Sequence, residues 1–263
     1  MPGKTRISGT KEWSNHSVNC CLGCSHDCRY CYARAMAVRF GRTTLADWRL
    51  ERIKPDAERM GRRRYSGTVM FPTTHDITPA NLHVTARVLG NLLEFGNRVL
   101  IVSKPHLECI EHICTRFSGN SSQILFRFTI GAYDDGILSF WEPGAPPWEE
   151  RLASLRLAGE QGFETSVSCE PLLQPEDAVG LVGRLLPYVT DTIWIGKANQ
   201  LELRTRGVLE PDHPAILHLG EWQTSEAVHT VYRALRDFPR IRWKESYKEV
   251  LGLKPAASAG LDL

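Results

Sequence analysis

Short apolar runs alternate with amphipathic stretches along the chain. The runs are rich in Val, Ile and Phe and are bounded by Gly, Pro or polar residues, a pattern typical of strands in a buried sheet. They predict strands at Ser17–Cys21, Thr68–Phe71, Val99–Ser103, Ile124–Ile130, Thr165–Cys169 and Thr192–Gly196.

The stretches between these strands carry apolar residues at helical spacing. Predicted helices begin after Thr78-Pro79, Pro105, Pro147, Pro175 and Ser225, and proline favours the first turn of a helix. Alternating strands and helices predict a parallel sheet with right-handed crossovers. Such units form either a doubly wound sheet or an incomplete barrel. In barrels, the catalytic and ligand-binding residues follow the C-terminal ends of the strands.

Composition places the chain among globular proteins. Its 263 residues are 42% hydrophobic and 24% charged, which is ordinary for a soluble domain. No segment is long and apolar enough to span a bilayer, and the N-terminus lacks the apolar stretch of a secretory signal. We therefore expect a cytoplasmic protein without membrane contact. In that reducing compartment, the eight cysteines indicate metal ligation or catalysis before disulfides.

Three cysteines follow the first predicted strand. Cys24, Cys28 and Cys31 lie within eight residues, and such closely spaced thiolates can ligate three irons of a cubane iron–sulfur cluster from one loop. The fourth iron then stays open to an exchangeable ligand. The alternative is a zinc site, for which Cys20 or Cys21 would supply a fourth thiolate or His26 would compete. Cys20 and Cys21 are otherwise packing residues at a strand end.

The C-x3-C-x2-C spacing resembles the signature of the radical S-adenosylmethionine (SAM) superfamily. Residues 23–34, Gly-Cys-Ser-His-Asp-Cys-Arg-Tyr-Cys-Tyr-Ala-Arg, are similar to the subgroup related to spore photoproduct lyase. The resemblance covers roughly residues 15–200. It implies a [4Fe–4S] cluster whose open iron binds SAM, and one-electron cleavage of SAM to a 5′-deoxyadenosyl radical that abstracts hydrogen from a substrate. It also implies that Tyr30 approaches the adenine.

The segment after the second strand resembles the lyase segment that meets the SAM amino group. The resemblance implies SAM contacts from Thr74, His75 and Asp76, although Asp76 alternatively caps the following helix. The lyases have a cysteine where this chain has Thr74, and that thiol returns a hydrogen atom to the product radical. The departure puts lyase activity on spore photoproduct in question. Cys169, at the end of the fifth strand, is an alternative hydrogen-atom donor or simply a buried residue.

Other strand ends carry further candidates. Lys104 follows the third strand, and the resemblance implies that it contacts the SAM carboxylate; otherwise it is a surface lysine. Thr129 resembles a SAM-binding serine, and the period of two puts it on the same, interior strand face as Arg127. Glu170 ends the fifth strand, where a carboxylate would bind the SAM ribose or the substrate.

Two further features concern structure and surface. Glu142 and Arg151 are expected to form an ion pair that ties a loop to the helix after it. The basic stretch from Arg49 to Arg64 is either a solvated face or a nucleic-acid contact, in a chain whose net charge is only +2.

Together these features predict a partial (β/α)6 TIM-like barrel of the radical SAM type. Residues 15–200 form the barrel after an N-terminal segment, 1–14, and residues 201–263 form a C-terminal extension packed on it, with an irregular loop at 205–224. The implied partners are a one-electron reductant, such as flavodoxin or ferredoxin, and a DNA or RNA substrate. The alternatives are a peptide or small-metabolite substrate, or a non-catalytic iron–sulfur or zinc module. The sequence does not specify the oligomeric state.

Overall fold

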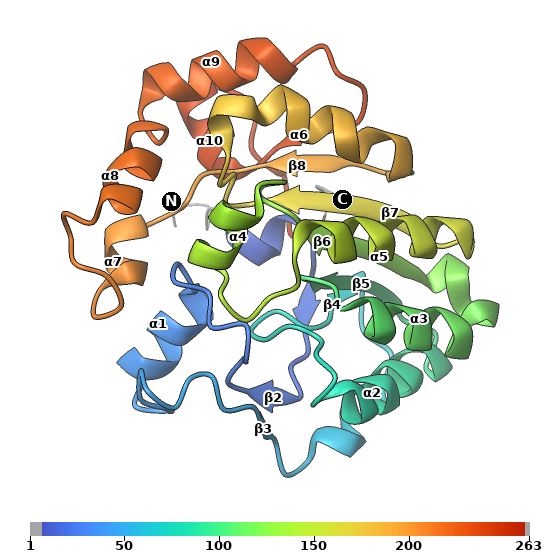
Figure 1. Ribbon diagram of the computed structural model, residues 1–263. Helices are drawn as coiled ribbons and strands as arrows, with labels where there is room; N and C mark the ends of the chain where they lie inside the picture. Colours follow the sequence, from blue (N-terminus) through green and yellow to red (C-terminus); the bar gives the residue numbers. More distant parts are fainter. Residues whose placement is uncertain (1–6, 261–263) are drawn as a thin grey trace, which may run out of the picture.

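A curved parallel sheet organises the computed structural model, which describes residues 7–260 (Figure 1). Its seven strands follow one another in sequence order without reversal. A doubly wound sheet would reverse its strand order, so this order defines an open barrel. The strands are β1 (His16–Ser17), β4 (Thr68–Met70), β5 (Arg98–Ser103), β6 (Ile124–Thr129), β7 (Glu164–Cys169), β8 (Ile193–Ile195) and β9 (Ile241–Trp243).

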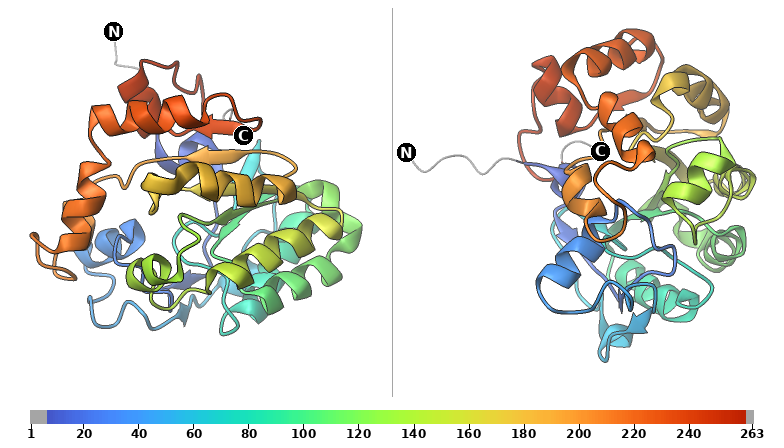
Figure 2. Two further views of the ribbon diagram at one scale, coloured as in Figure 1. Left: turned by 45° about the horizontal axis from the view of Figure 1, so that its top comes forward. Right: turned by 60° about the vertical axis from the view of Figure 1, so that its left-hand side comes forward.

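Helices cover the outer face of the sheet in sequence order, as Figures 1 and 2 show for α2, α3, α5, α6 and α9. Each buries an apolar stripe against the strands, as amphipathic helices do. The helices are α1 (Tyr32–Arg39), α2 (Leu82–Glu94), α3 (Leu107–Arg116), α4 (Asp135–Trp141), α5 (Trp148–Glu160), α6 (Ala178–Leu185), α7 (Leu201–Thr205), α8 (Pro214–Glu221), α9 (Ser225–Leu235) and α10 (Glu245–Leu251). Within residues 7–260, no helix has the length and hydropathy that crossing a membrane requires.

The predicted partial-barrel fold is confirmed, with local differences. Cys21 does not belong to β1 but begins β2 (Cys21–Leu22), which pairs antiparallel with β3 (Arg52–Ile53). The irregular loop predicted at 205–224 is wrong, because this range contains α8. Proline occupies its first turn, His213 Nδ1 accepts a hydrogen bond from the Ala215 N–H at 3.2 Å, and buried Ile216 and Leu219 anchor it.

The ends of the chain complete the barrel. Strand β9, from the predicted C-terminal extension, pairs with β8 as a seventh strand. A short 3-10 helix, Gly9–Glu12, precedes Trp13, whose ring packs against Trp194 inside the barrel at 5.5 Å. Lys244, just after β9, lies 2.6 Å from Glu12 and 3.8 Å from the centre of the Trp13 ring. Residues 1–6 of the predicted N-terminal segment and 261–263 of the extension lie outside the described range.

Trp13 forms the floor of the barrel interior. It packs with Met70, Leu100 and Leu125, which point inward from their strands. Arg127 lies in the interior, as predicted, with its guanidinium 4.5 Å from the Trp13 ring centre. Its Nε donates to Ser166 Oγ at 2.9 Å, and burial lowers the pKa of Arg127 to about 9. This packing closes one end of the barrel and leaves a cavity at the other.

Candidate cofactor and active site

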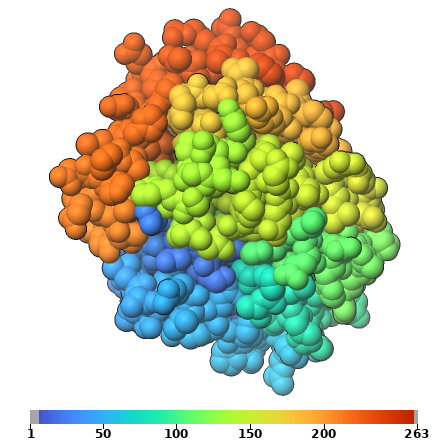
Figure 3. Space-filling view, viewed as in Figure 1, coloured from blue at the N-terminus to red at the C-terminus, as the bar shows by residue number. Residues whose placement is uncertain are grey.

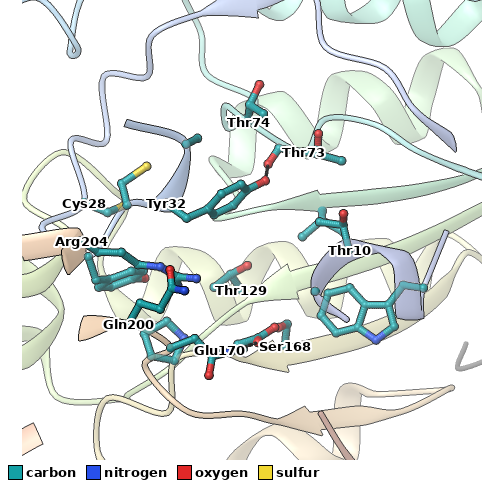
Figure 4. A pocket seen from close by; sticks show the side chains of 18 of the residues that line it. Thr10, Cys28, Tyr32, Thr73, Thr74, Thr129, Ser168, Glu170, Gln200 and Arg204 are labelled. Atoms are coloured by element: carbon teal, nitrogen blue, oxygen red, sulfur yellow. Dashed lines mark hydrogen bonds between the residues drawn. The ribbon is translucent and has the colours of Figure 1, made fainter. Parts of the chain in front are cut away.

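A cavity of about 960 Å³ lies at the C-terminal ends of the strands, within the size range of small-molecule and cofactor sites. Its walls come from the cysteine loop, the ends of β4 to β8, and helices α7 and α10. Figure 4 shows Cys28, Tyr32 and Thr74 on one side of it and Glu170, Gln200 and Arg204 on the other. This is the position at which barrels of this kind bind their ligands.

The three cysteines of the motif line this cavity together. The Cys24 N–H donates to the Trp48 carbonyl at 2.9 Å, and Cys31 caps helix α1 by accepting from the Arg34 N–H at 3.4 Å. Gly23 has a φ of +93°, and a Cβ there would lie 2.2 Å from the Leu50 carbonyl oxygen. Only glycine therefore permits the close approach between the cysteine loop and residues 48–50.

The electrostatics of the thiols favour a bound cation. Burial raises the pKa of Cys24, Cys28 and Cys31. Neighbouring negative charges raise it further for Cys24, where Asp76 is the main one, and for Cys28, whereas Arg34 acts against burial at Cys31. Lys104 is the main opposing charge near Cys28. Thiolates at this position therefore need additional positive charge, which a metal cluster supplies when it binds.

Asp76 and Lys104 form a charged pair beside the cysteines. Lys104 Nζ lies 3.5 Å from Asp76 Oδ2, and the Lys104 backbone N–H donates to Asp76 Oδ1 at 2.8 Å. The ammonium lowers the pKa of Asp76 well below its usual range, against the effect of burial. Lys104 is thus not a surface residue. Asp76 does not cap α2 either, because that helix begins at Leu82 after Asn81.

Two histidines, His26 and His106, extend the network of the Asp76–Lys104 pair. His26, fully buried, lies 2.9 Å through Nδ1 from Asp76 Oδ2 and 2.9 Å through Nε2 from His106 Nε2. His106 in turn faces Glu150 at 3.6 Å. Both ring nitrogens of His26 are therefore within hydrogen-bond distance of a partner. Donor atoms of Cys24, His26 and Asp76 also lie within 4.8 Å of one another, a spacing that a metal ion such as zinc fits as well. The sequence does not reveal this network because His26 and His106 are distant in the chain.

Tyr30 is fixed by a buried ion pair. Its hydroxyl donates to Glu142 Oε1, and Glu142 Oε2 lies 2.5 Å from Arg151 Nη1 with both side chains fully buried. The predicted Glu142–Arg151 pair is confirmed. Arg151 also donates to the Thr129 carbonyl at 3.4 Å. One arginine therefore links Tyr30 to the end of strand β6.

Thr74 lines the cavity, as expected from the segment after β4. Asn19 holds that segment, because its side-chain carbonyl accepts from the backbone N–H groups of Thr73 and Thr74 at 2.7 and 2.8 Å. His75 also lines the cavity, but both of its ring nitrogens are engaged elsewhere. Nδ1 lies 3.0 Å from the Asp76 carbonyl and Nε2 accepts from the Cys21 N–H at 3.3 Å.

Cys20 and Cys21 lie on the core side of His75 rather than among the cavity-lining residues. The Cys20 thiol is 3.7 Å from His75 Nε2 and 3.8 Å from the Cys21 thiol, and both cysteines are buried with almost no exposure. They pack in the core at hydrogen-bond distance from each other and from His75, and the donor atoms of these three residues lie within 4.8 Å of one another, as ligands of one metal ion would.

Thr129, Ser168 and Glu170 extend the lining away from the cysteines. Glu170 lies 3.5 Å from Lys244 Nζ and accepts from Asn199 Nδ2 at 3.4 Å, and burial raises its pKa. Arg204 from α7 also lines the cavity, with its guanidinium 5.8 Å from the centre of the Tyr32 ring, and burial lowers its pKa. No sequence signal singled out Arg204, because it lies beyond residue 200, where the family resemblance ends.

Cys169 is not brought to the cavity. Its neighbour Ser168 faces the cavity, whereas Cys169 is fully buried in the hydrophobic core, where burial raises its pKa to about 12. Successive strand residues point to opposite faces, so one residue of register separates the two environments.

The residues at the cysteine end fit an iron–sulfur cluster with one open corner. Three soft donors share the cavity, and among residues 7–260 no fourth cysteine lines it. Trp48, which is 1% exposed, packs with Cys24, and Cys31 borders the same group of residues. The indole N–H of Trp48 lacks a hydrogen-bond partner within the described residues. A buried donor of this kind normally has an acceptor, and cluster sulfurs would provide one.

The chain, with its cysteine loop and cavity at the strand ends, has the fold of its solved structural neighbours, which are radical SAM partial-barrel proteins. Spore photoproduct lyase complexed with dinucleoside spore photoproduct has the same fold, with a TM-score of 0.58 and 16% identity over 92% of this chain and 79% of that one. Streptococcus suis SuiB bound to precursor peptide SuiA has a TM-score of 0.55 and 10% identity over 92% of this chain and 51% of that one.

A second structure of SuiB, bound to S-adenosylmethionine, matches with a TM-score of 0.54 and 11% identity over 92% of this chain and 54% of that one. No family model matches the chain. Among curated proteins, the uncharacterised protein ORF301 of Acidianus two-tailed virus is 28% identical over 171 residues, which are 60% of this chain and 56% of that protein. The match thus spans about half the length of this relative.

Proposed function

We propose that the protein is a radical SAM enzyme in which Cys24, Cys28 and Cys31 hold a [4Fe–4S] cluster. The observation that carries this proposal is the meeting of three thiols with the Asp76–Lys104 pair at one end of a large cavity. When bound, the cluster and SAM supply one-electron cleavage of SAM and a carbon radical that abstracts hydrogen from the substrate. The chain supplies binding, orientation and exclusion of water.

Each lining residue has a role in this proposal that follows from its contacts. The Lys104 ammonium, held by Asp76, binds the SAM carboxylate. Tyr30, whose hydroxyl is fixed by Glu142, presents its ring to the adenine. Thr129 and Glu170 bind the ribose or the substrate farther along the cavity. Thr74 and Asp76 lie where the SAM amino group would bind, with the loop held by Asn19.

For the substrate, we favour a nucleic acid over a peptide or small metabolite. A fold relative is complexed with a dinucleoside, and the cations Lys197 and Arg204 line the cavity. Thr74 has an O–H rather than a thiol, and an O–H is a poor hydrogen-atom donor. The proposed reaction therefore does not return hydrogen from position 74.

The first test is reconstitution under anaerobic conditions. We expect a brown protein with about four iron atoms per chain, and release of 5′-deoxyadenosine on addition of dithionite and SAM. Zinc in place of iron, or iron without cleavage of SAM, would indicate a non-catalytic metal module instead.

The substrate is tested separately, by the salt dependence of oligonucleotide binding. Contacts to phosphates release counterions, so we expect the affinity to fall steeply between low and physiological salt. An affinity that does not change with salt would argue against a nucleic acid and favour the peptide or metabolite alternative. A candidate substrate deuterated at its reacting carbon would then transfer deuterium to the 5′ carbon of 5′-deoxyadenosine, which identifies the molecule that loses the hydrogen.

Replacement of Trp48 by phenylalanine tests the fit of the cluster. The variant keeps the apolar ring against Cys24 but loses the unpartnered indole N–H. A hydrogen bond to a cluster sulfur stabilises the reduced cluster, which is the more negative state. We therefore expect the variant to have unchanged iron content but a midpoint potential lower by up to about 40 mV. This is the one-electron equivalent of a net hydrogen bond of about 1 kcal/mol. Redox titration followed by electron paramagnetic resonance measures it. An unchanged potential would show that the N–H does not reach the cluster.

A further inference from the structure

The segment that covers the cysteine loop exposes an unusual number of apolar side chains. Met36, Phe40, Leu45, Leu50 and Ile53 are between 41% and 57% exposed, although large apolar residues are mostly buried in a folded chain. Together with the exposed Arg39, Arg42, Arg49 and Arg52, they make up what we call the α1–β3 face. Figure 3 shows this stretch, in blue, as a continuous area beside the orange helices α7 and α8.

The α1–β3 face is positively charged. None of its four arginines forms an ion pair with a carboxylate of the described residues. Arg39 and Arg42 instead place their guanidinium groups 5.8 and 5.5 Å from the Phe40 ring centre. The face therefore combines an apolar centre with unpaired cations.

The two carboxylates within this segment do not neutralise the face. Glu51 is turned toward the protein, where it accepts hydrogen bonds from Ser25, Thr78 and Asn81. Asp47 accepts from Thr44 Oγ1 at 2.7 Å within a local turn.

The same segment is the layer between solvent and the cysteines. On its inner side, Ala33, Ala37 and Trp48 pack against Cys24, with Cys31 alongside, and Cys31 is the N-cap of α1. The exposed Met36 lies on the same helix, and the exposed Phe40 is its C-cap. A partner seated on this face would be separated from the thiols by little more than one helix, about 10 Å thick. Such a separation permits electron transfer between redox centres.

We propose that the α1–β3 face is the docking surface for an acidic protein that carries one electron, of the flavodoxin or ferredoxin class. This proposal rests on the proposed function, which requires an external electron. Charge complementarity steers an acidic carrier to the arginines. The apolar centre, in which Phe40 is the one aromatic ring and the other four side chains are aliphatic, provides the desolvated contact of a protein interface rather than a platform for stacked bases. The partner chemistry therefore favours a protein here over the substrate.

The test compares two sources of electrons. Photoreduced flavodoxin and an acidic [2Fe–2S] ferredoxin serve as carriers, and dithionite serves as the small-molecule donor. In the R39E/R42E variant, and in F40D, we expect the carrier-dependent rate of 5′-deoxyadenosine formation to fall at least tenfold while the dithionite-driven rate stays unchanged. The affinity for the carrier, measured by calorimetry at low and high salt, should fall in parallel.

A matched control has the same change of charge elsewhere. The R62E/R63E variant alters the basic stretch outside the α1–β3 face, and we expect it to keep carrier-dependent activity. If R39E/R42E and R62E/R63E lost carrier-dependent activity equally, long-range electrostatic steering would explain the loss, and a docking site at the α1–β3 face would be overturned. Wild-type protein that responds to neither carrier would also overturn it, as would R39E/R42E losing oligonucleotide binding with carrier activity intact. Failure of dithionite as well would refute the proposed function itself.

Discussion

The Cys28→Ala variant is expected to lose the iron–sulfur cluster and all cleavage of SAM. A cubane cannot be held at three corners by two thiolates, and among residues 7–260 only Cys24, Cys28 and Cys31 bring thiols to the cavity. Iron content after anaerobic reconstitution, the visible absorption of the cluster and the yield of 5′-deoxyadenosine measure the loss.

Cys114→Ala is the matched control for this experiment. Cys114 is 1% exposed and belongs to the core-facing side of α3, outside the cavity lining. It should keep full iron content, so that the loss in Cys28→Ala is assigned to the ligand rather than to a missing sulfur. If Cys28→Ala retained four iron atoms per chain and still cleaved SAM, the ligand assignment would be wrong.

The strand-end rule explains why much of the site could be predicted. Lys104, Thr129 and Glu170 each follow or end a strand that hydrophobic pattern alone located, and all three line the cavity. The alternation of side chains along β6 also placed Arg127 and Thr129 inside the barrel correctly. These predictions depend only on the alternation of side chains along a strand and on the common direction of parallel strands, which brings their C-terminal ends to one side of the barrel.

Cys169 also ends a predicted strand, but its side chain points away from the cavity. In β7, Val167 and Cys169 pack in the hydrophobic core, whereas Ser168 lines the cavity. The barrel interior is therefore polar at the C-terminal end of β7, because the apolar face of this strand packs against the helices. The alternation of Ser and apolar residues in the sequence contains that signal, because the more polar face belongs to the cavity.

Other features depend on contacts that no local pattern contains. His26 meets His106 across 80 positions of the chain, and Lys244 reaches back to Glu12 at the opposite end of the described chain. Such pairings become visible only when the sheet curves and brings its first and last elements together.

Replacement of Arg151 by leucine is expected to destabilise the fold by about 3–5 kcal/mol, because it leaves the Glu142 carboxylate buried without its counterion. Both side chains are fully buried, so water cannot take over the role of the guanidinium. The loss also removes the hydrogen bonds of Arg151 to the carbonyls of Pro146 and Thr129. Urea denaturation of the metal-free protein measures the change in the free energy of unfolding.

The double variant E142L/R151L separates stability from function at this pair. Replacing both charges with apolar groups removes the unpaired carboxylate, so we expect much of the lost stability to return. The Tyr30 hydroxyl, however, then loses its acceptor Glu142, and the ring loses the contact that orients it. Affinity for SAM, measured on the reconstituted protein, should therefore stay low in the double variant even as stability recovers. If stability and SAM affinity recovered together, the ion pair would serve the fold alone, and the assignment of Tyr30 to the adenine would lose its structural support.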